Sequence, residues 1–227
     1  MLTVEVGGSS IQAIYFASSV AAEVVPLDQH RDDPWLLAAP GLIDGDRVRG
    51  AHHLGWQDVR ASHELQMSSS PLLSMNDAEA AALGEWWLRG RPQDTSLYIG
   101  LGTGVGAAAI VDGILVPIEF SHLTAFGPHR CEGCGRVGCL NAQIGGHTLP
   151  TPLSDSMIDA VVELLSLAIR QQTITFDRVV VGGGMARRYP AIVARLQGRL
   201  ERAITPSACS DWYKSAAPFG LLYMLRR

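Results

Sequence analysis

Short apolar runs separated by glycine-rich turns dominate the first part of the chain. Residues 3–6 and 11–16 are such runs, and Gly7-Gly8 between them predicts a hairpin turn in which glycine supplies a positive φ. A further run at 23–27 extends this meander. Residues 35–39 form a continuous apolar run, which is typical of a buried strand. The start of the chain therefore predicts a β-sheet.

The same order of strand, glycine turn and strand recurs later in the chain. Two apolar runs, 96–100 and 106–111, flank a turn that contains Gly102, Thr103 and Gly104. Such a recurrence is what a duplicated fold would leave in a sequence. Bare glycine amides beside a hydroxyl can also approach a phosphate group. A plain hairpin with no ligand is the alternative interpretation of both turns.

Helical spacing of apolar residues appears mainly in the second half of the chain. Ser154 is placed to cap an amphipathic helix over 154–170. Further helices are expected over 189–203 and roughly 219–226. An alanine-rich helix follows the strand that ends at Asn76, which is itself a good N-cap. Strands that alternate with helices predict an α/β fold.

Asp77 has a position that suits chemistry as well as structure. It follows the end of a predicted strand and opens a predicted helix. Open α/β sheets present their ligand crevice at such points, so the carboxylate could accept a proton from a substrate hydroxyl. The simpler explanation is a favourable interaction with the helix dipole.

Three of the four cysteines, Cys131, Cys134 and Cys139, lie within nine residues of one another. In a reducing compartment this clustering favours a metal over disulfides. Tetrahedral zinc needs a fourth ligand, for which His122 and His129 compete. His129 stands two residues before Cys131 and would form a strained chelate, so His122 is preferred.

Composition narrows the possible classes of protein. The chain has 227 residues, of which 47% are hydrophobic, and it suits one large domain or two small lobes. A net charge of −4 argues against nucleic acid as a direct partner. Because the N-terminus lacks a cationic region before an apolar run, neither a signal peptide nor a membrane span is expected. The expected location is the cytoplasm.

Seven motifs in register resemble the ROK family (repressor, open reading frame, kinase), a branch of the actin-like and hexokinase-like ATPase superfamily. They are Val6-Gly7-Gly8-Ser9, Ala39 to Asp44 with its Pro-Gly-x-x-Asp pattern, Leu54-Gly55-Trp56, Asn76 to Glu85, Leu101 to Gly106, Glu119-x-x-His122 with the cysteines after it, and Val179 to Gly184.

This resemblance implies an α/β fold of two ribonuclease-H-like lobes around a cleft, with a small zinc-binding loop. Residues 1–75 would form the N-terminal lobe, and residues 76–227 the C-terminal lobe with the zinc loop at 119–141. The last helix would pack back on the N-terminal lobe. ATP would bind mainly to the second lobe, and the family favours a homodimer.

The resemblance also implies a role for each matching residue. Asp77 would be the base that deprotonates a sugar hydroxyl, and Asn76, Glu119 and His122 would bind the sugar. Glu5 would help to organise Mg²⁺ with ATP. Phosphate or nucleotide contacts would come from Gly7, Gly8, Ser9, Gly102, Thr103, Gly104, Gly182, Gly183 and Gly184. Structural Zn²⁺ would be held by His122, Cys131, Cys134 and Cys139.

Some residues depart from the family pattern. Glu5 stands where the family usually has aspartate, Asn141 replaces the usual glutamate, and the chain is short for the family. The expected function is ATP-dependent phosphorylation of a hexose or N-acetylhexosamine. The alternative is a non-catalytic sugar-binding or regulatory relative with a degenerate nucleotide site. A DNA-binding repressor is disfavoured, because the chain opens directly on the first strand.

Overall fold

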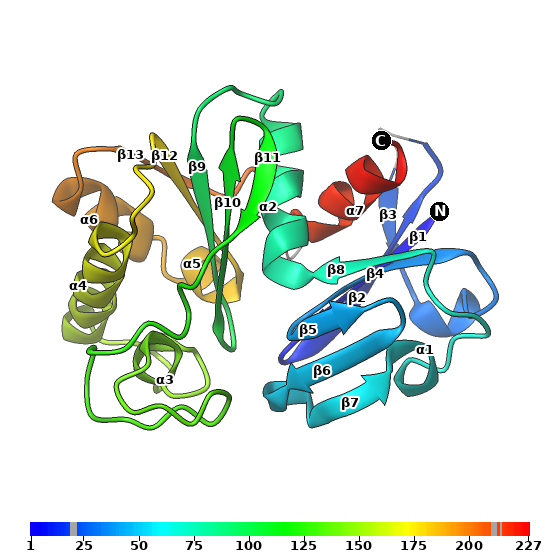
Figure 1. Cartoon of the computed structure of the whole chain (residues 1–227), viewed down its shortest axis with the longest axis horizontal. Helices are drawn as coiled ribbons and strands as arrows, with labels where there is room; N and C mark the ends of the chain where they lie inside the picture. The colour runs from blue at the N-terminus through cyan, green and yellow to red at the C-terminus, as the bar shows by residue number, and fades with distance from the viewer. Residues whose placement is uncertain (19–21, 210–212, 214) are drawn as a thin grey trace. The chain divides into compact units, whose positions relative to one another are not determined.

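The computed structural model describes residues 1–18, 22–209, 213 and 215–227, and it contains two compact units (Figure 1). The first unit comprises Met1–Gly90 together with Cys209–Arg227, and the second comprises Arg91–Ala208. The first unit therefore continues past the expected boundary at residue 75 and includes α2 (Asp77–Leu88).

A five-stranded sheet forms the centre of the first unit, in the order β3-β2-β1-β4-β8. Three strands are antiparallel neighbours, whereas β4 and β8 run parallel to β1. All five residues of β4 are buried, as their unbroken apolar run predicts. The strands are β1 (Leu2–Gly7), β2 (Ser10–Phe16), β3 (Ala22–Val25), β4 (Trp35–Ala39) and β8 (Leu73–Asn76), and a short 3-10 turn, η1, spans Leu27–Gln29.

The β1–β2 turn differs from the sequence-based expectation. Gly7 pairs with Ser10, so the strands are joined by two residues. Neither Gly7 nor Gly8 is among the glycines with a positive φ, so the expected positive φ was wrong. This hairpin closes with ordinary backbone angles.

A second, three-stranded sheet lies between β4 and β8 in the sequence. It consists of β5 (Leu42–Asp44), β6 (Arg47–Ala51) and β7 (Trp56–Arg60), with the 3-10 turn η2 (His52–Leu54) and helix α1 (Ala61–Glu64). The small sheet was not expected from the sequence, whereas the pattern over residues 58–67 does permit a short helix such as α1. These strands are short and mostly exposed, so they lack the apolar runs that predicted the central strands.

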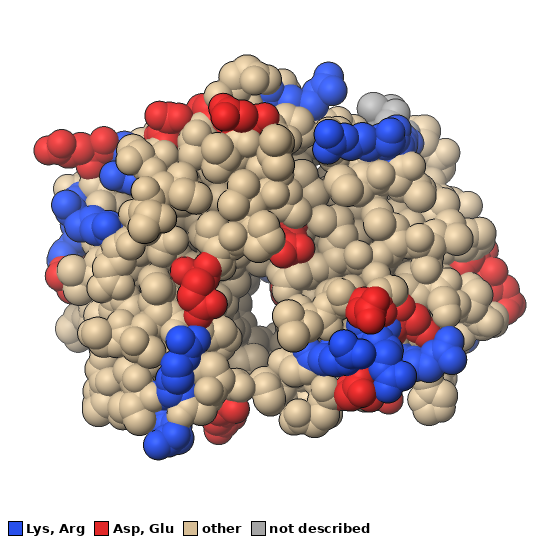
Figure 2. Space-filling model, in the orientation of Figure 1, with Lys and Arg blue, Asp and Glu red and all other residues tan. Residues whose placement is uncertain are grey.

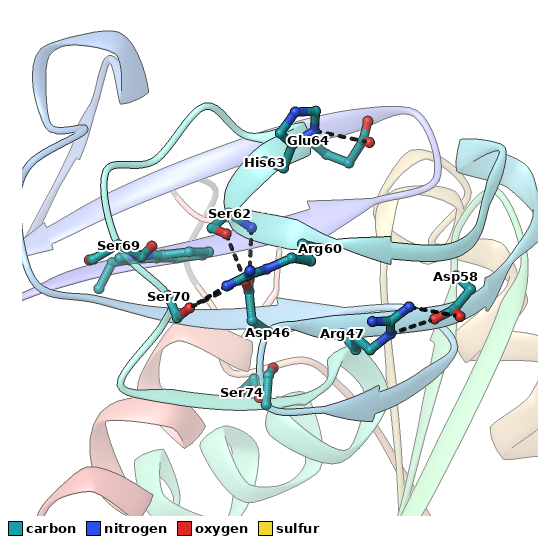
Figure 3. Close-up of polar contacts among 12 residues, drawn as sticks. Asp46, Arg47, Asp58, Arg60, Ser62, His63, Glu64, Ser69, Ser70 and Ser74 are labelled. Atoms are coloured by element: carbon teal, nitrogen blue, oxygen red, sulfur yellow. Dashed lines mark hydrogen bonds and ion pairs between the residues drawn. The ribbon is translucent and has the colours of Figure 1, made fainter.

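The carboxylate of Asp46 fixes this small sheet to α1 (Figure 3). It accepts hydrogen bonds from the Ser62 amide at 2.8 Å, the Ser62 hydroxyl at 2.7 Å and Arg60 Nε at 2.9 Å. Burial raises the pKa of Asp46, but hydrogen bonds from Ser62, Arg60 and Ser70 outweigh it and leave the pKa below its ordinary value. Asp46 therefore stabilises the join between β5–β6 and α1 as an anion.

Helix α2 and helix α7 (Ala217–Leu225) pack with their backbones in close approach. A Cβ atom built on Gly84 would overlap the Ala216 carbonyl, and one built on Gly220 would overlap the Ala80 carbonyl. Glycine at both positions therefore lets the two helices touch. The expected terminal helix at 219–226 is confirmed with a start two residues earlier.

The second unit repeats the arrangement of the first. Its sheet has the order β11-β10-β9-β12-β13, again with three antiparallel strands followed by two parallel ones. This matching order agrees with the duplication that the glycine turns suggested. The strands are β9 (Ser96–Leu101), β10 (Val105–Val111), β11 (Ile114–Pro117), β12 (Arg178–Gly182) and β13 (Ala203–Pro206).

Four helices accompany this second sheet: α3 (Leu140–Ile144), α4 (Asp155–Arg170), α5 (Gly184–Arg188) and α6 (Ala191–Arg199). The Ser154 hydroxyl caps α4 by accepting a hydrogen bond from the Met157 amide at 3.3 Å, as expected. The helix expected over 189–203 is shorter, because the chain turns into β13. The apolar faces of α4 and α6 share one core with β9 and β12.

Candidate functional site

The carboxyl ends of three parallel strands bring together the polar residues of the first unit. Glu5 on β1 pairs with Ala38, and the next residue along β4, Ala39, pairs with Asn76 on β8. Asp77 follows directly. Glu5 and Asp77 therefore lie at the same edge of one sheet, where open α/β sheets bind ligands.

Asn76 is the N-cap of α2, as the sequence predicts. Its Oδ1 accepts hydrogen bonds from the amides of Ala78 at 3.0 Å and Glu79 at 3.3 Å. Its Nδ2 donates to the Gly41 carbonyl at 3.1 Å. The Asn76 side chain thus fixes the turn after β4 against the start of α2. Because both contacts require one acceptor and one donor, a side-chain amide at this position has a structural explanation.

Asp77 has the electrostatics of a base that works near neutral pH. Burial raises the pKa of its carboxyl to about 6, against the opposing effect of hydrogen bonds from the backbone amides of Ala78 and Asp77 itself. The bond from Ala78 to Asp77 Oδ1 is 2.9 Å long. The nearby charge of Glu79 adds to the increase. A carboxylate with such a pKa is ionised at neutral pH and still a better proton acceptor than an ordinary aspartate.

Glu5 is held by the start of α7. Its Oε1 accepts a hydrogen bond from the Ser215 hydroxyl at 2.8 Å, and that hydroxyl accepts one from the Ala217 amide at 3.0 Å. Magnesium prefers carboxylate oxygens and water as ligands, so an oriented carboxylate at this edge fits the ion.

The glycine segments of the second unit also meet at one sheet edge. Gly100 on β9 pairs with Gly182 on the parallel strand β12. Gly183 has a φ of 91°, and a Cβ atom there would overlap the Leu101 carbonyl. A Cβ on Gly182 would lie 2.9 Å from the Tyr98 hydroxyl. Close packing of β9 against the β12–α5 turn therefore explains these two glycines.

Gly102 and Gly184 differ from these packed glycines. A Cβ atom built on either one would meet no other atom within 4 Å. Sterically, both positions could carry a side chain, so packing alone does not require glycine there. The open space beside each backbone is compatible with a phosphate or nucleotide that approaches the chain closely.

The segment after α3 supports the Gly102–Gly104 turn. The Gly146 amide donates to the Gly102 carbonyl at 3.0 Å, and the His147 amide donates to the Thr103 carbonyl at 3.0 Å. His147 Nδ1 lies 2.7 Å from the same Thr103 oxygen, which requires a proton on Nδ1. Nothing in the sequence marks His147, because a lone exposed histidine after two glycines carries no specific signal.

The cysteine loop gathers four potential metal ligands. One ligand atom from each of His122, Cys131, Cys134 and Cys139 lies within 4.8 Å of the others. His122 Nδ1 is 3.2 Å from Cys139 Sγ and 3.8 Å from Cys131 Sγ. His129, the alternative ligand, is outside the group found among the described residues.

Three thiols and one imidazole form a donor set that fits tetrahedral zinc. Burial raises the pKa of Cys139 to about 12, so a nearby cation is needed to keep this sulfur as a thiolate. Burial also raises the pKa of Cys134, but hydrogen bonds from the backbone and guanidinium of Arg136 leave it below its ordinary value. The cluster could therefore hold a zinc ion.

Arg136 joins the cysteine loop to Glu119. Its Nη2 donates to Glu119 Oε1 at 2.9 Å, and its guanidinium also bonds to the Cys134 sulfur. Both charged side chains are about half exposed. Sequence analysis identified Glu119 but not Arg136, because 17 residues separate them and no local motif reveals the pair.

The distribution of surface charge does not indicate a further binding site. Basic and acidic side chains are interspersed on the face shown in Figure 2, with no broad area of one sign. Within the described part of the chain, no helix has the length and apolar character required to cross a bilayer.

Comparison with known proteins identifies the relatives of this chain. The family model described as "ROK family" matches residues 35–155. A glucokinase of Halalkalibacterium halodurans is 37% identical over 46% of this chain and 35% of its own length. Kanosamine kinase of Amycolatopsis mediterranei is 28% identical over 72% of this chain and 65% of its own length. The aligned part thus spans less than two thirds of either enzyme.

A solved structure of similar fold is a ROK family glucokinase from Streptomyces griseus in complex with glucose and AMPPNP. It superposes with a TM-score of 0.74 at 18% identity, over 99% of both chains. At this identity the likeness supports the fold alone. Because the family model covers more than half of the sequence, the chain described here belongs to the ROK family.

Proposed function

We propose that this protein is an ATP-dependent kinase that phosphorylates a hydroxyl of a hexose or an N-acetylhexosamine. Membership of the ROK family and the named sugar kinases among its relatives support the general class. The observation that carries the proposal is Asp77, whose pKa is raised to about 6 at the carboxyl edge of the first sheet.

In this proposal Asp77 accepts the proton of the sugar hydroxyl that attacks the γ-phosphate of ATP. A well-placed general base contributes about 10²- to 10⁴-fold to the rate. Alignment of the reactants and electrostatic stabilisation of the phosphoryl group contribute much of the rest. Asn76, Glu119 and His122 are assigned to hydrogen bonds with the sugar hydroxyls.

Phosphate groups are assigned to the two glycine turns. Gly102, Thr103 and Gly104 form the turn of the second unit, and Gly7, Gly8 and Ser9 the turn of the first. Gly182, Gly183 and Gly184 are assigned to the nucleotide, with Gly184 the most open of the three.

Two metals have different roles in the proposal. Magnesium would neutralise charge on the phosphates of ATP, and Glu5 is the residue that would orient it. Zinc would be structural, held by His122, Cys131, Cys134 and Cys139. It would thereby fix the ring of His122 toward the sugar.

A coupled assay of ADP release over a panel of hexoses and N-acetylhexosamines tests this proposal. At least one sugar should stimulate ADP release, and Asp77→Asn should lower kcat/KM by at least about 100-fold. Glu79→Gln is the matched control: Glu79 is a half-buried acid on the same helix and only the smallest cause of the raised Asp77 pKa, so its loss should change kcat/KM far less. The absence of sugar-dependent ADP release, with Asp77→Asn equal to wild type, would reject the kinase.

The second candidate is a sugar-binding or regulatory relative that does not transfer phosphate. It is favoured by Glu5, which is longer than the family's aspartate and is hydrogen-bonded to Ser215. Calorimetry distinguishes the two functions, since this candidate predicts sugar binding without measurable binding of Mg-ATP.

A further inference from the structure

The short helix α3 lies between two features that sequence analysis treated separately, the cysteine cluster and the Gly102–Gly104 turn. Cys139 directly precedes α3, and its carbonyl accepts a hydrogen bond from the Ala142 amide at 3.0 Å. The Asn141 amide donates to the Ser121 carbonyl at 2.8 Å, one residue before His122. The first turn of α3 is thus attached to both ends of the ligand set.

The side chain of Asn141 spans the space between the cluster and the turn. Its Oδ1 accepts a hydrogen bond from the Val105 amide at 2.8 Å, directly after the glycine turn. Its Nδ2 lies 3.9 Å from Cys131 Sγ and is directed as a donor to that sulfur. The side chain is 6% exposed, so water does not readily replace either contact.

The other end of α3 reaches the same turn by a separate route. The chain leaves the helix through Gly145, and the amides of Gly146 and His147 bond to the carbonyls of Gly102 and Thr103. A Cβ atom on Gly146 would lie 2.5 Å from the Gly102 oxygen, so glycine permits this approach. Both ends of the turn are therefore held by α3 or by the residues that follow it.

We infer that metal binding at the cysteine cluster orders the Gly102–Gly104 turn through α3, with Asn141 as the positioning residue. A metal ion would hold the sulfurs of Cys131 and Cys139 in place, and the thiolate of Cys131 would then accept a hydrogen bond from Asn141 Nδ2. The amide oxygen is then directed to Val105. Without the metal, the buried sulfurs lose their common partner, and α3 loses its anchor.

This inference rests on the proposed function for the identity of both ligands, zinc and a nucleotide phosphate. It adds that the structural metal supports the nucleotide side of the second unit as well as His122. Because coupling between two binding sites is reciprocal, bound nucleotide should also raise the equilibrium affinity of the cysteine cluster for the metal.

Hydrogen exchange on the 227-residue chain tests the coupling without any need for activity. The first comparison is between zinc-loaded wild type and wild type treated with a chelator. The second comparison is between Asn141→Ala and Gln143→Ala, both loaded with zinc. Gln143 is the matched control, since it is an amide on α3 whose Nε2 bonds to the His129 carbonyl. Strand β12 reports whether the second unit stays folded.

The Val105 amide should exchange at least about tenfold faster in the chelated wild type and in Asn141→Ala, while β12 stays protected. Gln143→Ala should match the wild type. Unchanged exchange at residues 102–105 in either Asn141→Ala or chelated protein with folded β12 would overturn the inference.

If Asn141→Ala does not fold, Asn141→Asp, which has a similar size, replaces it. Asn141→Asp removes the hydrogen-bond donor to Cys131, so its affinity for zinc should be lower. When zinc is partly lost from this variant, the amides of the Gly102–Gly104 turn should exchange faster. Slow exchange of the turn at reduced zinc occupancy would overturn the coupling. If sugar stimulates turnover but exchange of the turn does not depend on the metal, the coupling is rejected and the kinase proposal stands. If exchange depends on the metal but no sugar stimulates turnover, only the kinase proposal is rejected.

Discussion

The hydroxyl of Ser215 donates a 2.8 Å hydrogen bond to the carboxylate of Glu5, although 210 positions separate them in the sequence. The same hydroxyl accepts the Ala217 amide at the start of α7. A single buried serine therefore stabilises the helix terminus and orients the carboxylate assigned to magnesium.

Replacement of this serine should affect both roles. Ser215→Ala removes a hydrogen bond to a carboxylate and a bond to the start of α7, so the first unit should lose about 2 kcal/mol of unfolding free energy. Chemical denaturation measures the loss. Ser215→Thr, which keeps the hydroxyl, is the control, and equal stability of the alanine and threonine variants would contradict the prediction.

Asp77→Asn should stabilise the protein while it lowers the proposed kinase activity. The folded pKa of about 6 lies above the ordinary aspartate value of 3.8, so the native state binds the proton more tightly. The stability that the proton provides is complete below pH 3.8 and is lost as the pH rises through 6. Above pH 6 the variant should therefore exceed wild type by on the order of 1 kcal/mol.

Denaturation midpoints of wild type and Asp77→Asn across pH 4 to about 8 measure this difference. It should vanish at the acid end and grow toward neutrality. A constant difference over the whole range would show that the pKa of Asp77 is not raised. In the kinase assay, activity of the wild type should fall as the pH drops below about 6.

Asp46 and Asp58 should respond differently to the same substitution, although both pair with arginines of the small sheet (Figure 3). Asp46 is 10% exposed and accepts three hydrogen bonds of 2.9 Å or less, whereas Asp58 is 49% exposed. Asp46→Ala should cost about 2 to 3 kcal/mol, because the Ser62 amide and Arg60 lose their acceptor. Asp58→Ala should leave the denaturation midpoint unchanged.

The lowered pKa of Asp46 sets the pH range of this effect. The stabilisation by Asp46 is present above the ordinary aspartate pKa of 3.8 and is lost as the pH falls through the lower folded pKa. Measurements at pH 7 should therefore show the full cost of Asp46→Ala. Equal midpoints for the two alanine variants would refute the anchoring role.

Metal content should distinguish the two candidate histidine ligands. His122→Ala removes one of four clustered donors, so protein purified without chelator should contain clearly less zinc than wild type. His129→Ala should retain one zinc per chain. Elemental analysis of the purified variants gives the result, and loss of zinc only from His129→Ala would reverse the assignment.

Caps and apolar patterns in the sequence predicted the bounds of the helices and strands that contain them to within a few residues. Helix α4 has a serine cap and a full apolar face, and β4 is apolar throughout. Strand β13 has neither feature, since only Ile204 is buried, and it forms as the parallel partner of β12. Its existence depends on a neighbour that is distant in the sequence.

The residues of the candidate site also fall into those that the sequence predicts and those that depend on distant contacts. The spacing of the cysteines predicts the metal cluster, and the position of Asp77 between a strand and a helix predicts a role in chemistry. Arg136, His147 and the bridging role of Asn141 depend on contacts between loops that no periodicity records. Asn141 in particular looks like a simple departure from the family pattern until its amide is placed against Val105.

The backbone contact between α2 and α7 has a consequence for biosynthesis. Residues 91–208 are contiguous and can complete their own core as soon as they leave the ribosome. Residues 1–90 emerge earlier, but their unit is complete only after α7 has also been made, because Gly84 and Gly220 can meet only then. The unit that contains residues 1–90 is therefore expected to finish folding after the unit of residues 91–208.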